Sequence, residues 1–200
     1  MSAEGADRGR RAWWLLLVPV IALALGMILL PSPPALPVIG PMAAFSLKDQ
    51  DGRAVTDKDL LGKVQIVDFI FTNCPDTCPT LTAKMSGLQR QIPGEAVGLV
   101  SFTVDPDRDT PEAMAAFAAR FGADHSRWRF LTGDAAQLRG VVRSMMLAAE
   151  KAEPGPDGSY NVVHSEKFVL LDRQSRIRGF YSANTEGLAQ LVIDAGLLRD

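Results

Sequence analysis

The fold of this chain is decided by the stretch Val67-Asp68-Phe69-Ile70-Phe71-Thr72-Asn73-Cys74-Pro75-Asp76-Thr77-Cys78-Pro79. Its first half is apolar, β-branched and aromatic with a single acid, a composition typical of a buried strand. Its second half turns into a helix, because the first turn of a helix tolerates a proline. The stretch therefore predicts a buried strand that leads directly into a helix.

The two cysteines of the chain, Cys74 and Cys78, lie at this junction, four residues apart. One helical turn places such a pair on the same face, and the start of a helix favours a thiolate at Cys74. Two easily ionised sulfurs at the end of a buried strand indicate a redox site, a metal site, or both. A purely structural disulfide is the alternative, but it gains little because the loop that it closes is short.

The N-terminal part differs in character from the rest. Residues 12–30 carry no charge and can just span a bilayer; three arginines precede them and two tryptophans lie near their start. This pattern predicts a transmembrane anchor at 12–30, with residues 1–11 in the cytoplasm and the remainder exported. A cleaved signal peptide is the alternative, but the apolar run is long for one and no clear Ala-x-Ala site follows.

Residues 31–41 contain five prolines and predict a stiff, extended tether. The remaining residues, 42–200, are enough for one domain. The net charge of the whole chain is −2, and no basic patch suggests a nucleic-acid partner. In an oxidising compartment outside the cytoplasm, the two cysteines can form a disulfide unless they are reduced or bind a metal.

Apolar periodicity and turn signals predict an alternation of strands and helices, which gives an α/β domain. A long loop is expected at 150–162, where prolines and glycines gather. Helices are expected to be capped by Thr110 and Asp134. The expected elements are strands at 64–71, 97–104 and 128–131, helices at 78–91, 110–121, 134–149 and 185–196, and hairpins at 43–55 and 166–181.

A strand, a cysteine at a helix start and a closing hairpin and helix follow the layout of the thioredoxin fold, although the spacing here is Cys-x-x-x-Cys. With these features the chain resembles the Sco/SenC family of membrane-anchored copper proteins that assemble cytochrome c oxidase. The resemblance covers about residues 40 to 197 and rests on the quoted stretch and on three further motifs, Val104-Asp105-Pro106-Asp107-Arg108-Asp109-Thr110-Pro111, Trp128-Arg129-Phe130-Leu131-Thr132-Gly133 and Tyr160-Asn161-Val162-Val163-His164-Ser165.

The resemblance implies a thioredoxin-like fold with a central mixed sheet flanked by helices, an N-terminal hairpin and one N-terminal transmembrane helix. It places the copper ligands of the family at Cys74, Cys78 and His164. The chemistry of these residues agrees, because thiolates favour Cu(I) and imidazole binds both Cu(I) and Cu(II). Tetrahedral zinc would need a fourth ligand, which a carboxylate or water could supply. His125, the other histidine, is expected to be exposed.

Three acids are candidates for supporting roles. Asp68 interrupts an apolar strand, where thioredoxin-like proteins place an acid that exchanges protons with the cysteines. It is either a proton acceptor of raised pKa or a hydrogen-bonded core acid. Asp105 and Asp109 follow a strand on the side where α/β sites usually lie. They face the copper site or a partner, or they cap a helix and solvate a loop.

The first functional interpretation is a copper chaperone in the bacterial inner membrane, with a single span and a periplasmic domain. It would accept copper from a periplasmic donor and deliver it to the binuclear copper centre of cytochrome c oxidase subunit II. The second is a thiol-disulfide reductase that keeps the cysteines of that centre reduced, so enzymatic activity is a secondary expectation. A peroxiredoxin-like peroxidase is a third reading, but Phe71 stands where that family needs threonine.

Overall fold

The computed structural model describes residues 17–21, 36–74, 77–92, 94–145, 151–154, 160–162 and 167–199. The chain divides into two compact units, Met1–Ala35 and Leu36–Asp200. In the first unit, residues 17–21 are helical, and most of the apolar segment 12–30 lies outside the described residues. Among the residues that are described, none of the helices combines the length and apolar character that a membrane span needs.

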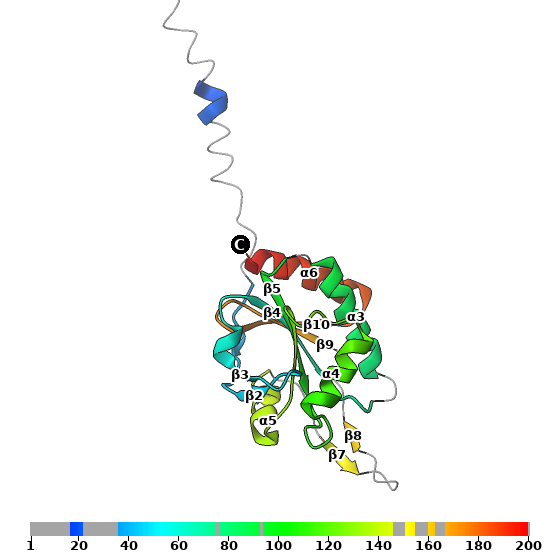
Figure 1. Cartoon of the computed structure of the whole chain (residues 1–200). Coiled ribbons are helices and arrows are strands. Elements are labelled where there is room, and N and C mark those ends of the chain that lie inside the picture. Colours follow the sequence, from blue (N-terminus) through cyan, green and yellow to red (C-terminus); the bar gives the residue numbers. More distant parts are fainter. Residues whose placement is uncertain are drawn as a thin grey trace, which may run out of the picture. The chain divides into compact units, whose positions relative to one another are not determined.

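A six-stranded mixed sheet forms the centre of the second unit (Figure 1). Three neighbouring strands run parallel, so their carboxyl ends meet at one edge of the sheet. The other three pair antiparallel to their neighbours. The order across the sheet is β1 (Gly40–Pro41), β10 (Arg176–Ser182), β9 (Lys167–Leu171), β4 (Val64–Ile70), β5 (Val97–Thr103) and β6 (Trp128–Leu131).

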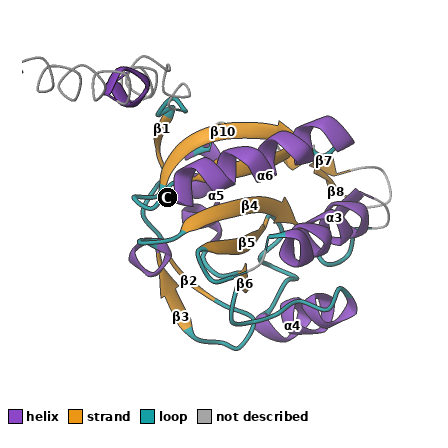
Figure 2. Cartoon of the chain, turned by 90° about the horizontal axis from the view of Figure 1, so that it is seen from above, coloured by secondary structure: helices purple, strands orange, loops and turns teal. Residues whose placement is uncertain are grey.

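Helices cover both faces of this sheet (Figures 1 and 2). One face packs against α3 (Thr77–Gln91), α4 (Pro111–Arg120) and α6 (Thr185–Arg199). The other packs against α5 (Ala135–Ser144), the hairpin of β2 (Ser46–Lys48) and β3 (Ala54–Thr56), and the short 3-10 helix η1 (Asp57–Leu60). Side chains alternate along β4, so Ile66 and Ile70 belong to the first core and Val67 and Phe69 to the second.

Several expected local features are confirmed. The Thr110 side chain accepts a hydrogen bond from the backbone of Ala113 at the start of α4. The Asp134 side chain accepts one from the backbone of Gln137 at the start of α5, at 2.9 Å. The two hairpins form, and Gly52 in the turn of the first adopts a positive φ of 77°. These features depend on neighbouring residues alone, which is why the sequence predicts them well.

Two expected elements were wrong. The helix expected to continue to about residue 149 ends at Ser144, with Met145 as its C-cap, and residues 146–149 lie outside the described residues. The expected loop at 150–162 contains two strands, β7 (Lys151–Pro154) and β8 (Tyr160–Val162), paired antiparallel. Tyr160 and Val162 have high strand propensity. Pro154 is the last residue of β7, and the other proline and the glycines of this segment lie between the two strands in the sequence.

The compact unit begins earlier than the boundary at residue 42 that the prolines suggested. Gly40 pairs with Ile177 on the edge of the sheet. The Arg178 side chain donates to the carbonyl of Pro37 at 3.0 Å and also to that of Leu36. Residues 36–41 are therefore part of the folded unit.

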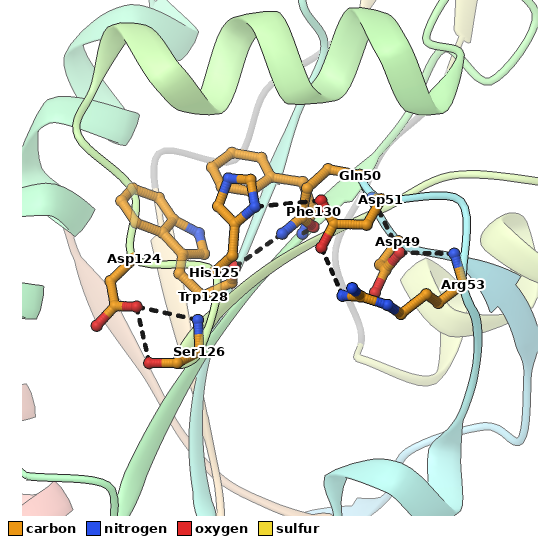
Figure 3. A network of polar contacts seen from close by, with 9 residues as sticks. All are labelled: Asp49, Gln50, Asp51, Arg53, Asp124, His125, Ser126, Trp128 and Phe130. Carbon is orange, nitrogen blue, oxygen red and sulfur yellow. Dashed lines mark hydrogen bonds and ion pairs between the residues drawn. The ribbon is translucent and has the colours of Figure 1, made fainter.

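The exposed edge of β6 is covered by the turn that joins β2 and β3 (Figure 3). The Gln50 amide donates to the Trp128 carbonyl at 3.4 Å, and its oxygen accepts from the Phe130 backbone at 2.8 Å. The backbones of Lys48 and Thr132 also bond each other, at 2.8 and 2.9 Å. The Gln50 side chain thus extends the row of hydrogen bonds that the backbone of Lys48 makes to Thr132, just after β6. The edge of β6 is therefore not free to pair with a strand of another chain.

We expect Gln50→Ala to lower the free energy of unfolding by about 2 kcal/mol, because it leaves buried backbone groups of Trp128 and Phe130 without partners. Urea denaturation monitored by circular dichroism would measure the change. Gln91→Ala, at the exposed end of α3, is the matched control and should change stability by less than about 0.5 kcal/mol. Equal stabilities of the two variants would contradict the role of Gln50.

Candidate metal centre

Cys74 and Cys78 lie where β4 passes into α3, as their spacing predicts. The backbone N–H of Cys74 donates to the Phe71 carbonyl at 3.4 Å, which closes the turn after the strand. The backbone N–H of Cys78, in the first turn of α3, donates to the Cys74 sulfur at 3.2 Å. Both residues are free thiols. The turn and the helix start therefore bring two sulfurs together at the carboxyl edge of the sheet.

The two sulfurs are not equivalent. Cys74 is 9% exposed, whereas Cys78 is 1% exposed. Burial strongly raises the pKa of the Cys78 thiol, and its hydrogen bond with Cys74 and the negative charges of Cys74 and Asp68 raise it further. Cys74 is therefore the sulfur that a metal ion or a partner meets first. Cys78 gives up its proton less readily than an ordinary thiol.

Asp68 is fully buried on the face of β4 that packs against α3. Neither of its carboxylate oxygens has a hydrogen-bond partner among the described residues. Burial raises the pKa of Asp68 to about 7, and the nearby Ser101 hydroxyl lowers it by less. That hydroxyl lies on the adjacent strand and accepts from the Trp128 indole at 2.9 Å, but it falls short of hydrogen-bond geometry with the acid. This favours a proton acceptor over a hydrogen-bonded core acid.

Asp105 and Asp109 follow β5 at the same edge of the sheet as the cysteines. Asp109 is fully buried, and its carboxylate accepts hydrogen bonds from Thr72 and Thr103. Burial raises the pKa of Asp109, while these bonds oppose the change. Asp105 is more exposed; its backbone N–H donates to the Thr103 hydroxyl at 2.9 Å, and its carboxylate lies 3.5 Å from Arg108.

His164 lies outside the described residues, so its role as a third ligand stays a prediction. Within the described part of the chain, no group of three His, Cys, Asp or Glu side chains is arranged to hold a metal ion. His125 is exposed, as expected, and its ring nitrogen lies 3.3 Å from the Asp51 carboxylate (Figure 3). The described part of the centre is therefore the cysteine pair with Asp68 beneath it.

Sequence reasoning missed the hydroxyl groups around the centre. The hydroxyls of Thr72 and Thr103 donate to Asp109, and that of Ser101 accepts from the Trp128 indole. Threonine and serine are common in strands and loops, so their presence in the sequence does not mark them as part of a site. The one available signal is position, because Thr72 and Thr103 stand at or just after the end of a buried strand. Nothing in the sequence shows which acid they contact.

The model of one protein family, SCO1/SenC, matches residues 40–193 of this chain. The chain belongs to the SCO1/SenC family. The match spans both cysteines, the acids and His164. It also explains why the three motifs that follow the cysteines occur in one chain in this order.

Solved structures of Sco proteins share the fold. A SCO1/SenC family lipoprotein from Bacillus anthracis superposes with a TM-score of 0.72 at 32% identity, covering 82% of this chain and 98% of that one. ScoI from Bradyrhizobium japonicum, solved with copper bound, gives 0.65 at 34%, covering 76% and 97%. BsSco, described as having a disulfide switch and as a member of a family of cytochrome c oxidase assembly proteins, gives 0.70 at 28%, covering 82% and 96%. The thioredoxin-like α/β fold with a mixed sheet is thus confirmed.

The raised pKa of Asp68 has a consequence for stability. The folded state holds the proton up to about pH 7, whereas the unfolded chain releases it near 3.8, so the unfolded state binds fewer protons between these values. The contribution of the Asp68 carboxyl group to the free energy of unfolding is fully present below about pH 4 and is lost as the pH rises through 7. We expect the wild type to lose up to about 4 kcal/mol of stability over this window through Asp68.

The measurement is the free energy of unfolding of the reduced, metal-free protein against pH. Asp68→Asn should show a flatter dependence between pH 4 and 7, because the amide does not titrate. Asp107→Asn, at an exposed position of the loop after β5, is the control and should keep the wild-type slope. Parallel curves for the wild type and Asp68→Asn would contradict the assignment.

Proposed function

We propose that this protein is a copper carrier for the assembly of cytochrome c oxidase and that it binds copper through Cys74, Cys78 and His164. The observation that carries the proposal is the pair of free thiols at the start of α3, where the backbone N–H of Cys78 donates to the Cys74 sulfur. Membership of the SCO1/SenC family supports it, since ScoI was solved with copper and BsSco belongs to a family of oxidase assembly proteins. The cargo is Cu(I), Cu(II) or both, and the recipient is the binuclear copper centre of subunit II.

The residues fit this cargo. Two soft thiolates suit Cu(I), and a neutral imidazole adds a ligand that also suits Cu(II). Two thiolates with Cu(I) carry a net charge of −1. Cys78 lies in the first turn of α3 and Cys74 shortly before the helix begins, where the positive end of the helix dipole favours negative charge.

Proton transfer accompanies loading, because both thiols must lose their protons when they bind the metal. The thiol of Cys78 holds its proton firmly, since burial raises its pKa. Asp68 lies near enough for its charge to raise that pKa further, and its own pKa is about 7. Asp68 can therefore take the proton of Cys78 as the metal enters and return it when the metal leaves.

Delivery proceeds by ligand exchange. A thiolate of the recipient first replaces Cys74, the more exposed sulfur, and a second then replaces Cys78. Asp105 and the loop after β5 lie at the same edge of the sheet and would face the recipient. We infer that the carrier is held by residues 12–30 in the bacterial inner membrane, with the domain in the periplasm, where a donor supplies the copper.

A second function is favoured by the unequal depth of the two thiols. In a thiol-disulfide reductase, the Cys74 thiolate attacks the disulfide of the recipient and forms a mixed disulfide, and one recipient thiolate leaves. Cys78, deprotonated by Asp68, then attacks Cys74, so the recipient gains two electrons and this chain is left with a disulfide. A thiol reductant in the same compartment would restore the dithiol.

The ligand set makes a direct prediction for copper affinity. Cys74→Ser or Cys78→Ser should abolish tight Cu(I) binding, because one thiolate cannot replace two. His164→Ala should weaken Cu(II) binding more than Cu(I) binding, because Cu(II) relies more on nitrogen. Competition with a chelator of known affinity and the Cu(II) absorption spectrum would measure both. His125→Ala is the matched control, and an unchanged Cu(II) spectrum in His164→Ala would remove that residue from the site.

A His164 variant distinguishes the two proposed functions, because a copper carrier needs the imidazole ligand and a dithiol reductase does not. The test uses the soluble copper domain of subunit II, either reduced and empty or oxidised to its disulfide. A carrier fills the reduced domain with copper, and His164→Ala impairs the transfer. A reductase opens the disulfide, and His164→Ala does so at nearly the wild-type rate. Efficient disulfide reduction without detectable copper transfer would overturn the first proposal in favour of the second.

A further inference from the structure

The turn that carries Cys74 is tied to the next strand by one carboxylate. Asp109 accepts the Thr72 hydroxyl at 2.6 Å, and the backbone N–H of Thr72 lies 3.2 Å from each of its carboxylate oxygens. Thr72 stands two residues before Cys74 and one after Phe71, whose carbonyl closes the same turn. The bonds of Asp109 therefore act on the backbone that leads directly to the first sulfur.

Asp109 is itself held from three further sides. The Thr103 hydroxyl, at the end of β5, donates to the carboxylate oxygen Oδ2. The backbone N–H of Asp109 donates to the Asp105 carbonyl at 3.0 Å, and the Thr132 hydroxyl, just after β6, donates to the Asp109 carbonyl. Threonines that end or follow the three parallel strands thus converge on one residue. Such a residue cannot move without moving a strand end.

Burial makes these bonds strong. Asp109 and Thr103 are fully buried, so water does not compete for the carboxylate. Both oxygens already accept hydrogen bonds from Thr72 or Thr103. A carboxylate engaged in this way acts as a fixed support and not as a metal ligand.

The geometry points to Asp109 as the positioning residue of the metal centre: through Thr72 it fixes the turn of Cys74, and so the place of that sulfur relative to Cys78. This inference rests on the proposed function only for the identity of the metal ion that the two sulfurs bind. The spacing of the sulfurs depends on two links. The Cys78 backbone holds the Cys74 sulfur from the helix, and Asp109 holds the turn from the sheet.

The experiment compares hydroxyl deletions on the two sides of the same carboxylate in the full-length protein. Thr72→Val removes the hydroxyl bond, which is the shortest on the side of the turn, and keeps the two longer bonds of the backbone N–H; Thr72→Ser keeps all three. Thr103→Val removes a bond on the side of β5 and leaves the turn attached, so it is the matched control. Asp109→Asn tests the carboxylate itself, because one of its two acceptor oxygens becomes a donor.

Two measurements are made on each variant beside its melting temperature. The first is the ratio of iodoacetamide alkylation rates at Cys74 and Cys78 in the reduced, metal-free protein, measured by mass spectrometry. The second is Cu(I) affinity by chelator competition, together with the sulfur-to-Cu(II) absorption band. We expect Thr72→Val and Asp109→Asn to change the alkylation ratio, shift the band and lower Cu(I) affinity about tenfold. Thr72→Ser should resemble the wild type, and Thr103→Val should lose thermal stability while changing the ratio and the band less than Thr72→Val does.

Equal effects of Thr72→Val and Thr103→Val on the ratio and band, or no effect of either, would overturn the inference and leave Asp109 a stabilising residue only. The Thr72 variants decide the matter even where Asp109→Asn fails to fold. Absence of copper binding by the wild type would refute the proposed function alone, because the alkylation ratio is measured without metal.

Discussion

The complete burial of β4 is the constraint on which the rest of the structure depends. Each of its seven residues is buried, and it pairs with β5 on one side and β9 on the other. A strand held in this way has one register and one end point. The turn that follows it must therefore satisfy its polar groups at a fixed place, and the two cysteines are carried to that place by the chain itself.

Local chemistry made much of the fold predictable. The junction of strand and helix at Cys74, the cap at Thr110 and the cap at Asp134 each depend on residues within a few positions. The cover of β6 does not, because Gln50 bonds to backbone groups 78 and 80 residues away. The hairpin of β7 and β8 was missed because the run Pro154-Gly155-Pro156-Asp157-Gly158 gave the stronger signal, that of a loop.

The candidate site divides in the same way. The spacing of Cys74 and Cys78 predicted two sulfurs close together at the start of a helix, and in the structure Cys78 lies in the first turn of α3 with Cys74 before it. A lone acid in an apolar strand drew attention to Asp68. Among the described residues neither oxygen of this acid has a hydrogen-bond partner, and the nearby hydroxyl belongs to Ser101 on β5, which the sequence alone does not align with it. The bond from Thr72 to Asp109 crosses 37 residues and is set by the parallel pairing of strands. His164 rests on the family motif alone.

The unpartnered state of Asp68 suits a site that must hold and then release a charged cargo. In the proposed site, two thiolates and Cu(I) leave one negative charge at a buried position, where a second ionised group would be repelled strongly. Copper bound there would therefore keep Asp68 protonated. When the recipient takes the ion, the proton can pass back to Cys78, whose burial favours the neutral thiol. A hydrogen-bonded, permanently ionised acid could not make this exchange, so the function would require an acid such as Asp68, which has no hydrogen-bond partner within the described part of the chain.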